Sequence, residues 1–184
     1  MSHPSRSEPG ILLLAPVTTV GQAAGAAAAG AQMVDAGRDG ALVPAIRRAV
    51  SGVGVCGEHE DADLVRDADL AARTGAALIC PGPDAAAAAV RRGVAAGRIL
   101  VQATTAGIEA AVRAGWTVLA DLEGLADLEG LEGLARTEAV AAVCAWLGAS
   151  VLRTRYVAEV RRCADMTESI LGRRPPAWAA RGLA

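Results

Sequence analysis

The stretch GAALICPGPDAAAAAVRRGVAAGRILVQA, residues 75–103, contains the unit from which the chain is built. Two short apolar runs, Ala77–Cys80 and Ile99–Ala103, flank an alanine-rich segment with the composition of a helix. Short, unbroken apolar runs are typical of strands that are covered on both faces. Strands that alternate with helices predict parallel pairing, because each helix carries the chain back to the start of the next strand.

The same unit recurs along the whole chain. Segments such as Val20–Ala29 and Ala62–Thr74 have the length and composition of helices. Glycine precedes several of the apolar runs, where it suits the left-handed residue that ends a helix. The predicted strands are Ile11–Ala15, Gln32–Asp35, Val53–Cys56, Ala77–Cys80, Ile99–Ala103, Val118–Asp121 and Ser150–Arg153.

A closed barrel of the TIM type and an open, doubly wound sheet both satisfy this pattern. An open sheet that binds a dinucleotide would carry a GxGxxG turn after the first strand, whereas residues 16–21 read PVTTVG. We therefore expect an α/β fold of the TIM-type (β/α) barrel class. Because a standard barrel has eight strands, we expect this one to be short or irregular, with about seven strands.

The chain divides into one domain and two tails. Its 184 residues and 53% hydrophobic content suit a single domain with a substantial core. We expect residues 1–10 to be a disordered segment, 11–172 to form the barrel and 173–184 to be an extended tail. The low-complexity stretch 121–134, DLEGLADLEGLEGL, predicts an expanded loop or a frayed helix.

Composition excludes several classes of partner. The formal net charge is -2 and 2% of residues are aromatic, so the chain lacks the basic face and stacking residues of a nucleic-acid-binding protein. Its apolar runs are too short to span a bilayer or to form a signal-peptide core. We therefore expect a cytoplasmic protein with reduced cysteines and with neither a nucleic-acid nor a membrane partner.

Two segments resemble the dihydropteroate synthase (pterin-binding) family. GAQMVDAG, residues 30–37, is similar to the family's second strand, which reads roughly GADIIDVGGEST. GASVLRTRYV, residues 148–157, is similar to its last strand, usually GA.I.RVHDV. The resemblance covers about a quarter of the chain and implies a related barrel that is shorter than complete members of the family.

The resemblance also implies a reaction for which this chain lacks the side chains. The family joins a pterin pyrophosphate to p-aminobenzoate in folate biosynthesis, using carboxylates and an Asn for the pterin ring, a Lys nearby, and an Arg–His pair for the pyrophosphate. This chain contains no Lys and no Asn. Arg153 stands at the family's Arg position, but Arg155 replaces the His and Tyr156 the following Asp. The family motifs NVTPDSF, SVDT and ND correspond to residues 15–21, residues 55–58 and Cys80-Pro81.

We therefore expect a truncated, degenerate member of the family, a pseudoenzyme without condensation activity that acts as a binding or partner subunit. The alternative is a repurposed enzyme of specialised metabolism that acts on an anionic or aromatic small molecule in the barrel mouth. A third interpretation is an aldolase-type or phosphate-binding barrel whose likeness to the family is accidental. The expected partners are an anionic or pterin-like ligand and a second copy of the chain or a partner protein. Candidate dimer contacts are Val143, Trp146, Ile170 and Leu171.

Candidate site residues stand at the ends of predicted strands, where barrel enzymes carry their working groups. Arg153 and Arg155 are candidates for anion binding, because alternate residues of a strand point to one face. The alternative is that both pair with nearby carboxylates, namely Asp35, Asp121 or Glu123. The candidates for the ligand pocket are Asp35, Cys56, Cys80 and Asp121.

Cys56, Cys80 and His59 also suggest a metal site or a thiol–imidazole pair. Their spacing matches no known ligand pattern, and a free cysteine is commonly a small buried apolar residue. We therefore expect no metal and no cofactor, and the sequence assigns no catalytic residue.

Overall fold

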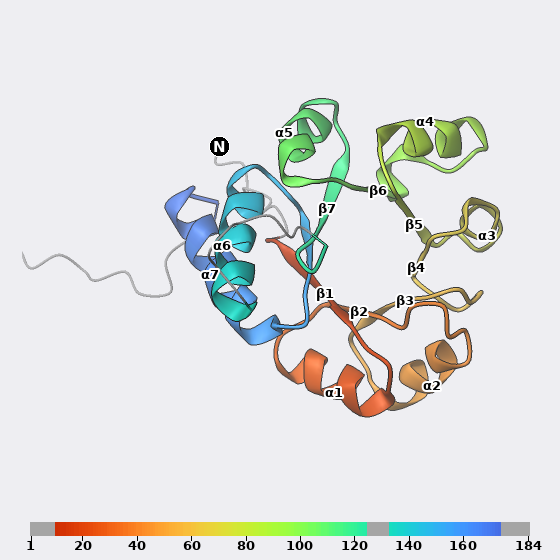
Figure 1. Ribbon diagram of the computed structural model, residues 1–184. Helices are drawn as coiled ribbons and strands as arrows, with labels where there is room; N and C mark the ends of the chain where they lie inside the picture. Colours follow the sequence, from red (N-terminus) through yellow and green to blue (C-terminus); the bar gives the residue numbers. More distant parts are fainter. Residues whose placement is uncertain (1–9, 125–132, 174–184) are drawn as a thin grey trace, which may run out of the picture.

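Eight parallel strands close into a barrel in the computed structural model, which describes residues 10–124 and 133–173 (Figure 1). The first strand pairs with both the second and the last, so that Leu14 lies opposite Met33 on one side and Arg153 on the other. The predicted TIM-type barrel is confirmed, with eight strands rather than about seven. They are β1 Leu12–Pro16, β2 Met33–Asp35, β3 Gly54–Cys56, β4 Leu64–Val65, β5 Ala77–Cys80, β6 Ile99–Gln102, β7 Thr117–Asp121 and β8 Val151–Arg153.

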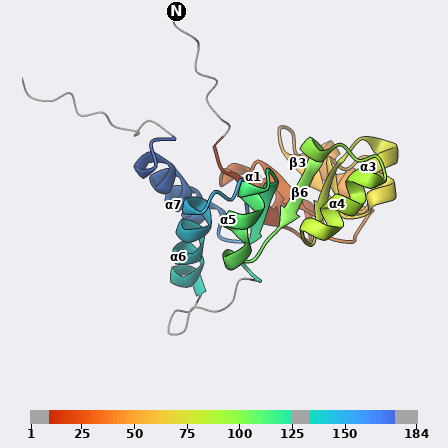
Figure 2. The same cartoon turned by 90° about the horizontal axis from the view of Figure 1, so that it is seen from above.

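Helices surround the barrel, and the last two lie side by side (Figures 1 and 2). Thr19 and Asp67 cap the first and third helices through side-chain oxygens, and Gly75 ends the third in the left-handed conformation, with φ of 84°. These signals set the start of the first helix and both ends of the third. The helices are α1 Val20–Ala28, α2 Leu42–Ala49, α3 Ala68–Thr74, α4 Pro83–Arg91, α5 Thr105–Arg113, α6 Gly133–Trp146 and α7 Val157–Ile170, with a 3₁₀ turn at Ala96–Arg98.

The strand that the sequence pattern missed is β4. It lies inside the segment Ala62–Thr74, which we expected to be helical, and the helix begins only at Ala68. With two residues, β4 is too short to form a visible apolar run, yet it joins β3 to β5 through parallel pairing. The connection from β3 to β4 contains no helix. It starts at Gly57, where a Cβ would lie 2.6 Å from Val43 Cγ2 of α2.

The strands separate two apolar layers. One lies inside the barrel and consists of Leu14, Met33, Cys56, Leu64, Ile79, Leu119 and Val151. The other lies between strands and helices and includes the alternate strand residues Val34, Val55, Val65 and Leu152. Because every second residue faces inward, the residue two positions beyond an inner-layer residue also points into the barrel, at its C-terminal end.

Several predictions concern residues that the structure describes only in part. The predicted N-terminal segment and C-terminal tail lie almost wholly outside the described residues, as does most of the low-complexity stretch 121–134. Within that stretch, Asp121 ends β7 and Gly133 begins α6. Among the described helices, none is long and apolar enough to cross a membrane.

Candidate functional site

Charged side chains occupy the C-terminal end of the barrel interior. Asp35 ends β2, Asp121 ends β7 and Arg153 ends β8, each two positions beyond an inner-layer residue. Arg66 directly follows β4 and lies two positions beyond the inner-layer residue Leu64. The sequence predicted three of these four groups, and the structure brings them together with Arg66 into one network, which we call the mouth network.

Asp35 lies at the centre of the mouth network. Its side chain is 1% exposed and accepts hydrogen bonds from two guanidinium groups. Arg66 donates from Nη2 to Oδ2 at 2.8 Å and from Nη1 to Oδ1 at 3.2 Å, while Arg153 donates from Nε to Oδ2 at 2.9 Å. The backbone N–H of Gly37 adds a bond to Oδ1 at 3.0 Å. A buried carboxylate is stable only when it is so surrounded.

Arg153 joins Asp35 to a second carboxylate. Its Nη1 donates to Asp121 Oδ1 and Oδ2 at 3.2 and 3.1 Å. The Arg153 and Asp121 side chains are 23% and 21% exposed, so this end of the network is partly accessible to solvent. Two carboxylates and two guanidinium groups leave the mouth network without net formal charge. The alternative that Arg153 pairs with internal carboxylates is the arrangement that the structure contains.

The network perturbs the acidity of its members. Burial alone would raise the pKa of Asp35, but the hydrogen bond and charge of Arg66, followed by Arg153, lower that pKa below its usual value. Burial likewise works to lower the pKa of each arginine, and the carboxylate partners raise it instead. Asp35, Arg66 and Arg153 are therefore charged at neutral pH.

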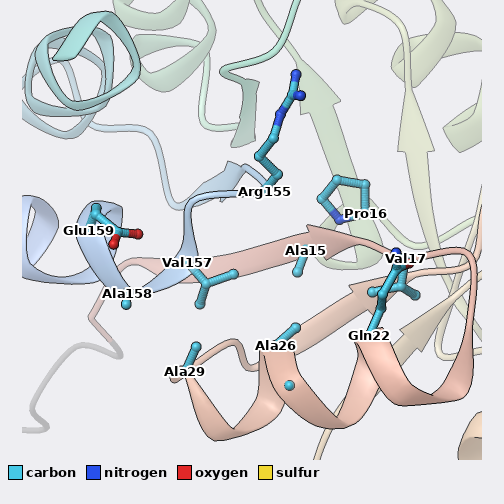
Figure 3. A pocket seen from close by; sticks show the side chains of 11 residues that line it. Ala15, Pro16, Val17, Gln22, Ala26, Ala29, Arg155, Val157, Ala158 and Glu159 are labelled. Carbon is cyan, nitrogen blue, oxygen red and sulfur yellow. The ribbon is translucent and has the colours of Figure 1, made fainter. Parts of the chain in front are cut away.

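Arg155 lies outside this network. It follows the end of β8, is exposed, and donates from Nε to Glu123 Oε2 at 2.7 Å, with a second contact from Nη2. Its backbone N–H also donates to Glu123 Oε1 at 3.1 Å. Arg155 thus has a different carboxylate partner from Arg153, and it borders a groove of about 350 Å³ between α1 and the start of α7 (Figure 3).

The two candidate cysteines face opposite sides of the strands. Cys56 lies inside the barrel, where Arg66 Nη1 donates to its Sγ at 3.4 Å, and burial together with the charge of Asp35 raises the pKa of the thiol to about 12. Cys80 belongs to the layer between strands and helices, so it faces away from the barrel interior. Strand β4 also separates β3 from β5.

His59 sits in the connection from β3 to β4, beside Asp61. The structure therefore does not bring His59, Cys56 and Cys80 together. Among residues 10–124 and 133–173, no three His, Cys, Asp or Glu side chains form a group that could hold a metal ion.

The position of β4 corrects one correspondence with the family. The motif ND of the fourth strand was matched to Cys80-Pro81, but Cys80 ends the fifth strand. The residues that follow the fourth strand are Arg66 and Asp67. Asp67 accepts a hydrogen bond from the Leu70 N–H at 2.7 Å and caps α3, and Arg66 points into the mouth. The sequence signal that we missed is the charged pair Arg66-Asp67, which directly follows the apolar pair Leu64-Val65.

Comparisons with known proteins find no matching family model and no matching curated relative. Among solved structures, the Mycobacterium tuberculosis protein Rv1207 is 26% identical, with a TM-score of 0.73 and coverage of 91% of this chain and 94% of that chain. The dihydropteroate synthase of Thermus thermophilus is 19% identical, with a TM-score of 0.73 and coverage of 89% and 94%. That of Yersinia pestis is 16% identical, with a TM-score of 0.72 and coverage of 89% and 93%. The two synthases share the fold of this chain.

Proposed function

We propose that this chain, which is dihydropteroate synthase-like over 89% of its length, has lost the condensation reaction and acts as a non-catalytic binding or partner protein. The mouth network carries the proposal. Arg153 stands where the family resemblance places the arginine for pyrophosphate, and its Nε and Nη1 are engaged by Asp35 and Asp121. A chain without Lys or Asn also lacks two of the side chains on which the family's chemistry depends.

The proposed ligand is pterin-like and lies over the mouth network. A dihydropteroate synthase from Xanthomonas albilineans has been solved in complex with 7,8-dihydropteroate, and it shares the fold of this chain. In the mouth, Asp35 and Asp121 provide carboxylate acceptors, which suit the N–H groups of such a ring. The four cysteines are free, in keeping with a reducing compartment, and we propose the cytoplasm.

Two measurements on the purified protein test this proposal. With pterin pyrophosphate and p-aminobenzoate as substrates, we expect no dihydropteroate in a discontinuous chromatographic assay in which an active synthase serves as the positive control. With pterin alone, we expect saturable quenching of the ligand's fluorescence, reduced in Asp121→Asn. Formation of dihydropteroate, or complementation of a strain that lacks the synthase, would overturn the loss of activity. Absence of any pterin binding would overturn the binding role.

The exposed Arg155 favours a second candidate function, an enzyme that acts on an anionic or aromatic small molecule. Arg155 is 66% exposed and pairs with Glu123, and Figure 3 shows its side chain pointing away from the groove. The first residues of α7, whose N–H groups attract anions, line the groove itself. In this alternative, Arg155 leaves Glu123 to bind the anionic group. Calorimetric titration with pyrophosphate distinguishes the two candidates: heat that disappears in Arg155→Ala supports the anionic ligand, and no heat from the wild type excludes it.

A further inference from the structure

Arg66 pairs with the buried Asp35 carboxylate in the way that a ligand would. We propose that the Asp35 carboxylate is the receptor for a planar group with two parallel N–H donors, and that Arg66 must swing out for this group to bind. Amidinium groups, guanidinium groups and the 2-amino-4-oxopyrimidine edge of a pterin ring share this chemistry. The inference rests on the proposed binding role of the mouth and names the part of a ligand that would be recognised there.

The contact between Arg66 and Asp35 has the form of a ligand contact. Two nitrogens of one planar group, Nη1 and Nη2, meet the two carboxylate oxygens at 3.2 and 2.8 Å. The two-pronged bond matches the spacing of donors on any N–C–N unit, whether it belongs to a side chain or to a ring. Asp35 therefore already has the orientation that such a ring edge would need.

Solvent can reach the subsite from the side of Arg66. The Arg66 side chain is 37% exposed, whereas Asp35 beneath it is 1% exposed. Removal of the guanidinium would therefore open a path to both carboxylate oxygens. The remaining donors to Asp35, the Nε of Arg153 and the N–H of Gly37, would still hold the carboxylate in place.

Arg66 is the exchangeable partner, and Arg153 is the fixed one. Arg153 bridges carboxylates from β2 and β7, so that its departure would break both contacts. Arg66 follows a strand of two residues. Besides Asp35, the Cys56 sulfur, a weak acceptor at 3.4 Å, is the only hydrogen-bond acceptor of its guanidinium among the described residues, and Glu58 acts on it through charge. A ligand that replaces Arg66 at Asp35 therefore restores nearly every hydrogen bond that its departure breaks.

The competing explanation is that Arg66 only neutralises a buried carboxylate. In that case, truncating Arg66 lowers stability and no small molecule compensates. If Arg66 fills a ligand subsite, truncation leaves a receptor with its preferred partner missing, and a small N–C–N compound restores it. The two explanations thus differ in the response of the truncated protein to an added ligand.

The test uses the full chain, Arg66→Ala and two probes, benzamidine as a cationic N–C–N group and pterin as a neutral ring edge. We expect at least one probe to bind Arg66→Ala at least about tenfold more tightly than wild type by calorimetry, because one charge-assisted contact has this magnitude. The same probe should raise the melting temperature of Arg66→Ala more than that of wild type. Arg47→Ala is the matched control, because it loses an exposed ion pair to Asp63 at 2.7 Å and should gain no binding.

Each outcome decides the inference. Tighter binding by Arg66→Ala that is lost in the Asp35→Asn/Arg66→Ala double variant supports it, and the probe that binds identifies a cationic or a neutral ligand. Equal affinity of wild type and Arg66→Ala, or no binding by either, overturns it. Pterin binding that ignores Arg66 would refute this subsite while leaving the proposed binding role intact. Arg66→Met keeps most of the side-chain volume and replaces Arg66→Ala if the alanine variant fails to fold.

Discussion

Substitution of Arg153 by alanine tests whether the mouth network supports the fold. The change removes the donor at 2.9 Å from Asp35 and the donors at 3.1 and 3.2 Å from Asp121. In the variant, Asp35 remains buried and keeps Arg66 and the Gly37 N–H as its partners. Asp121 is partly exposed, so water can hydrate its carboxylate. The loss is therefore smaller than that of a wholly buried ion pair with a single partner.

We expect Arg153→Ala to lower the free energy of unfolding by about 2–3 kcal/mol at neutral pH. Breaking a buried ion pair costs about 3–5 kcal/mol, and the retained Arg66 contact and partial exposure reduce that figure. For a domain of this size the change corresponds to a fall in melting temperature of about 4–12 °C. Arg155→Ala is the matched control, since its pair with Glu123 is exposed and should contribute less than about 1 kcal/mol.

Urea unfolding followed by far-ultraviolet circular dichroism measures the difference, with an unchanged m-value as evidence that the denatured state is the same. Calorimetry with pyrophosphate, carried out on the same two proteins, separates stability from anion binding. An unchanged unfolding midpoint in Arg153→Ala would refute the reasoning. Heat of pyrophosphate binding in wild type that vanishes in Arg153→Ala would show that the guanidinium serves an anion instead.

Three further predictions concern acidity, thiols and assembly. Burial alone would raise the pKa of Asp35, but Arg66 and Arg153 lower that pKa in the folded state. The carboxylate therefore contributes its full stabilisation above the unfolded-state pKa of about 4, and this contribution is lost as the pH falls through the lower folded-state pKa. Urea midpoints of wild type and Asp35→Asn should therefore converge on acidification, and parallel curves would contradict this. Burial raises the pKa of Cys56 to about 12 and that of Cys144 to about 11. Iodoacetamide at pH near 8 should therefore leave both unmodified in the native protein, as mass spectrometry would show, and label them after unfolding. Trp146 and Ile170 on the paired helices α6 and α7 are 58% and 67% exposed, and we predict a homodimer through this face. Light scattering should show a dimer that Trp146→Glu dissociates, and a monomeric wild type at micromolar concentration would count against it.

The sequence reveals the strands that are covered on both faces, because each forms an apolar run between helices. Strand β4 escaped detection because two residues cannot form such a run, and Arg66 escaped with it. Asp35, Asp121 and Arg153 were predictable as charged residues that directly end apolar runs.

Cys80 was predicted as a pocket residue because it also ends an apolar run, yet its side chain faces the helices and not the barrel interior. A strand with both faces buried shows no alternation of polar and apolar residues, so the sequence does not reveal which residues point into the barrel. Only the register, with Ile79 in the inner layer, decides the direction of Cys80.

The mouth network also links stability to binding. Four charges at one end of the barrel are costly to desolvate, and apolar side chains of similar volume would stabilise the fold at least as well. The two arginines that pair with Asp35 have different roles, because Arg153 bridges two strands while Arg66 meets a single carboxylate. A ligand that takes the place of Arg66 exchanges one pair of donors for another and leaves the bridge intact. A ligand that took the place of Arg153 would have to replace contacts to two carboxylates at once, which is why we place the exchange at Arg66.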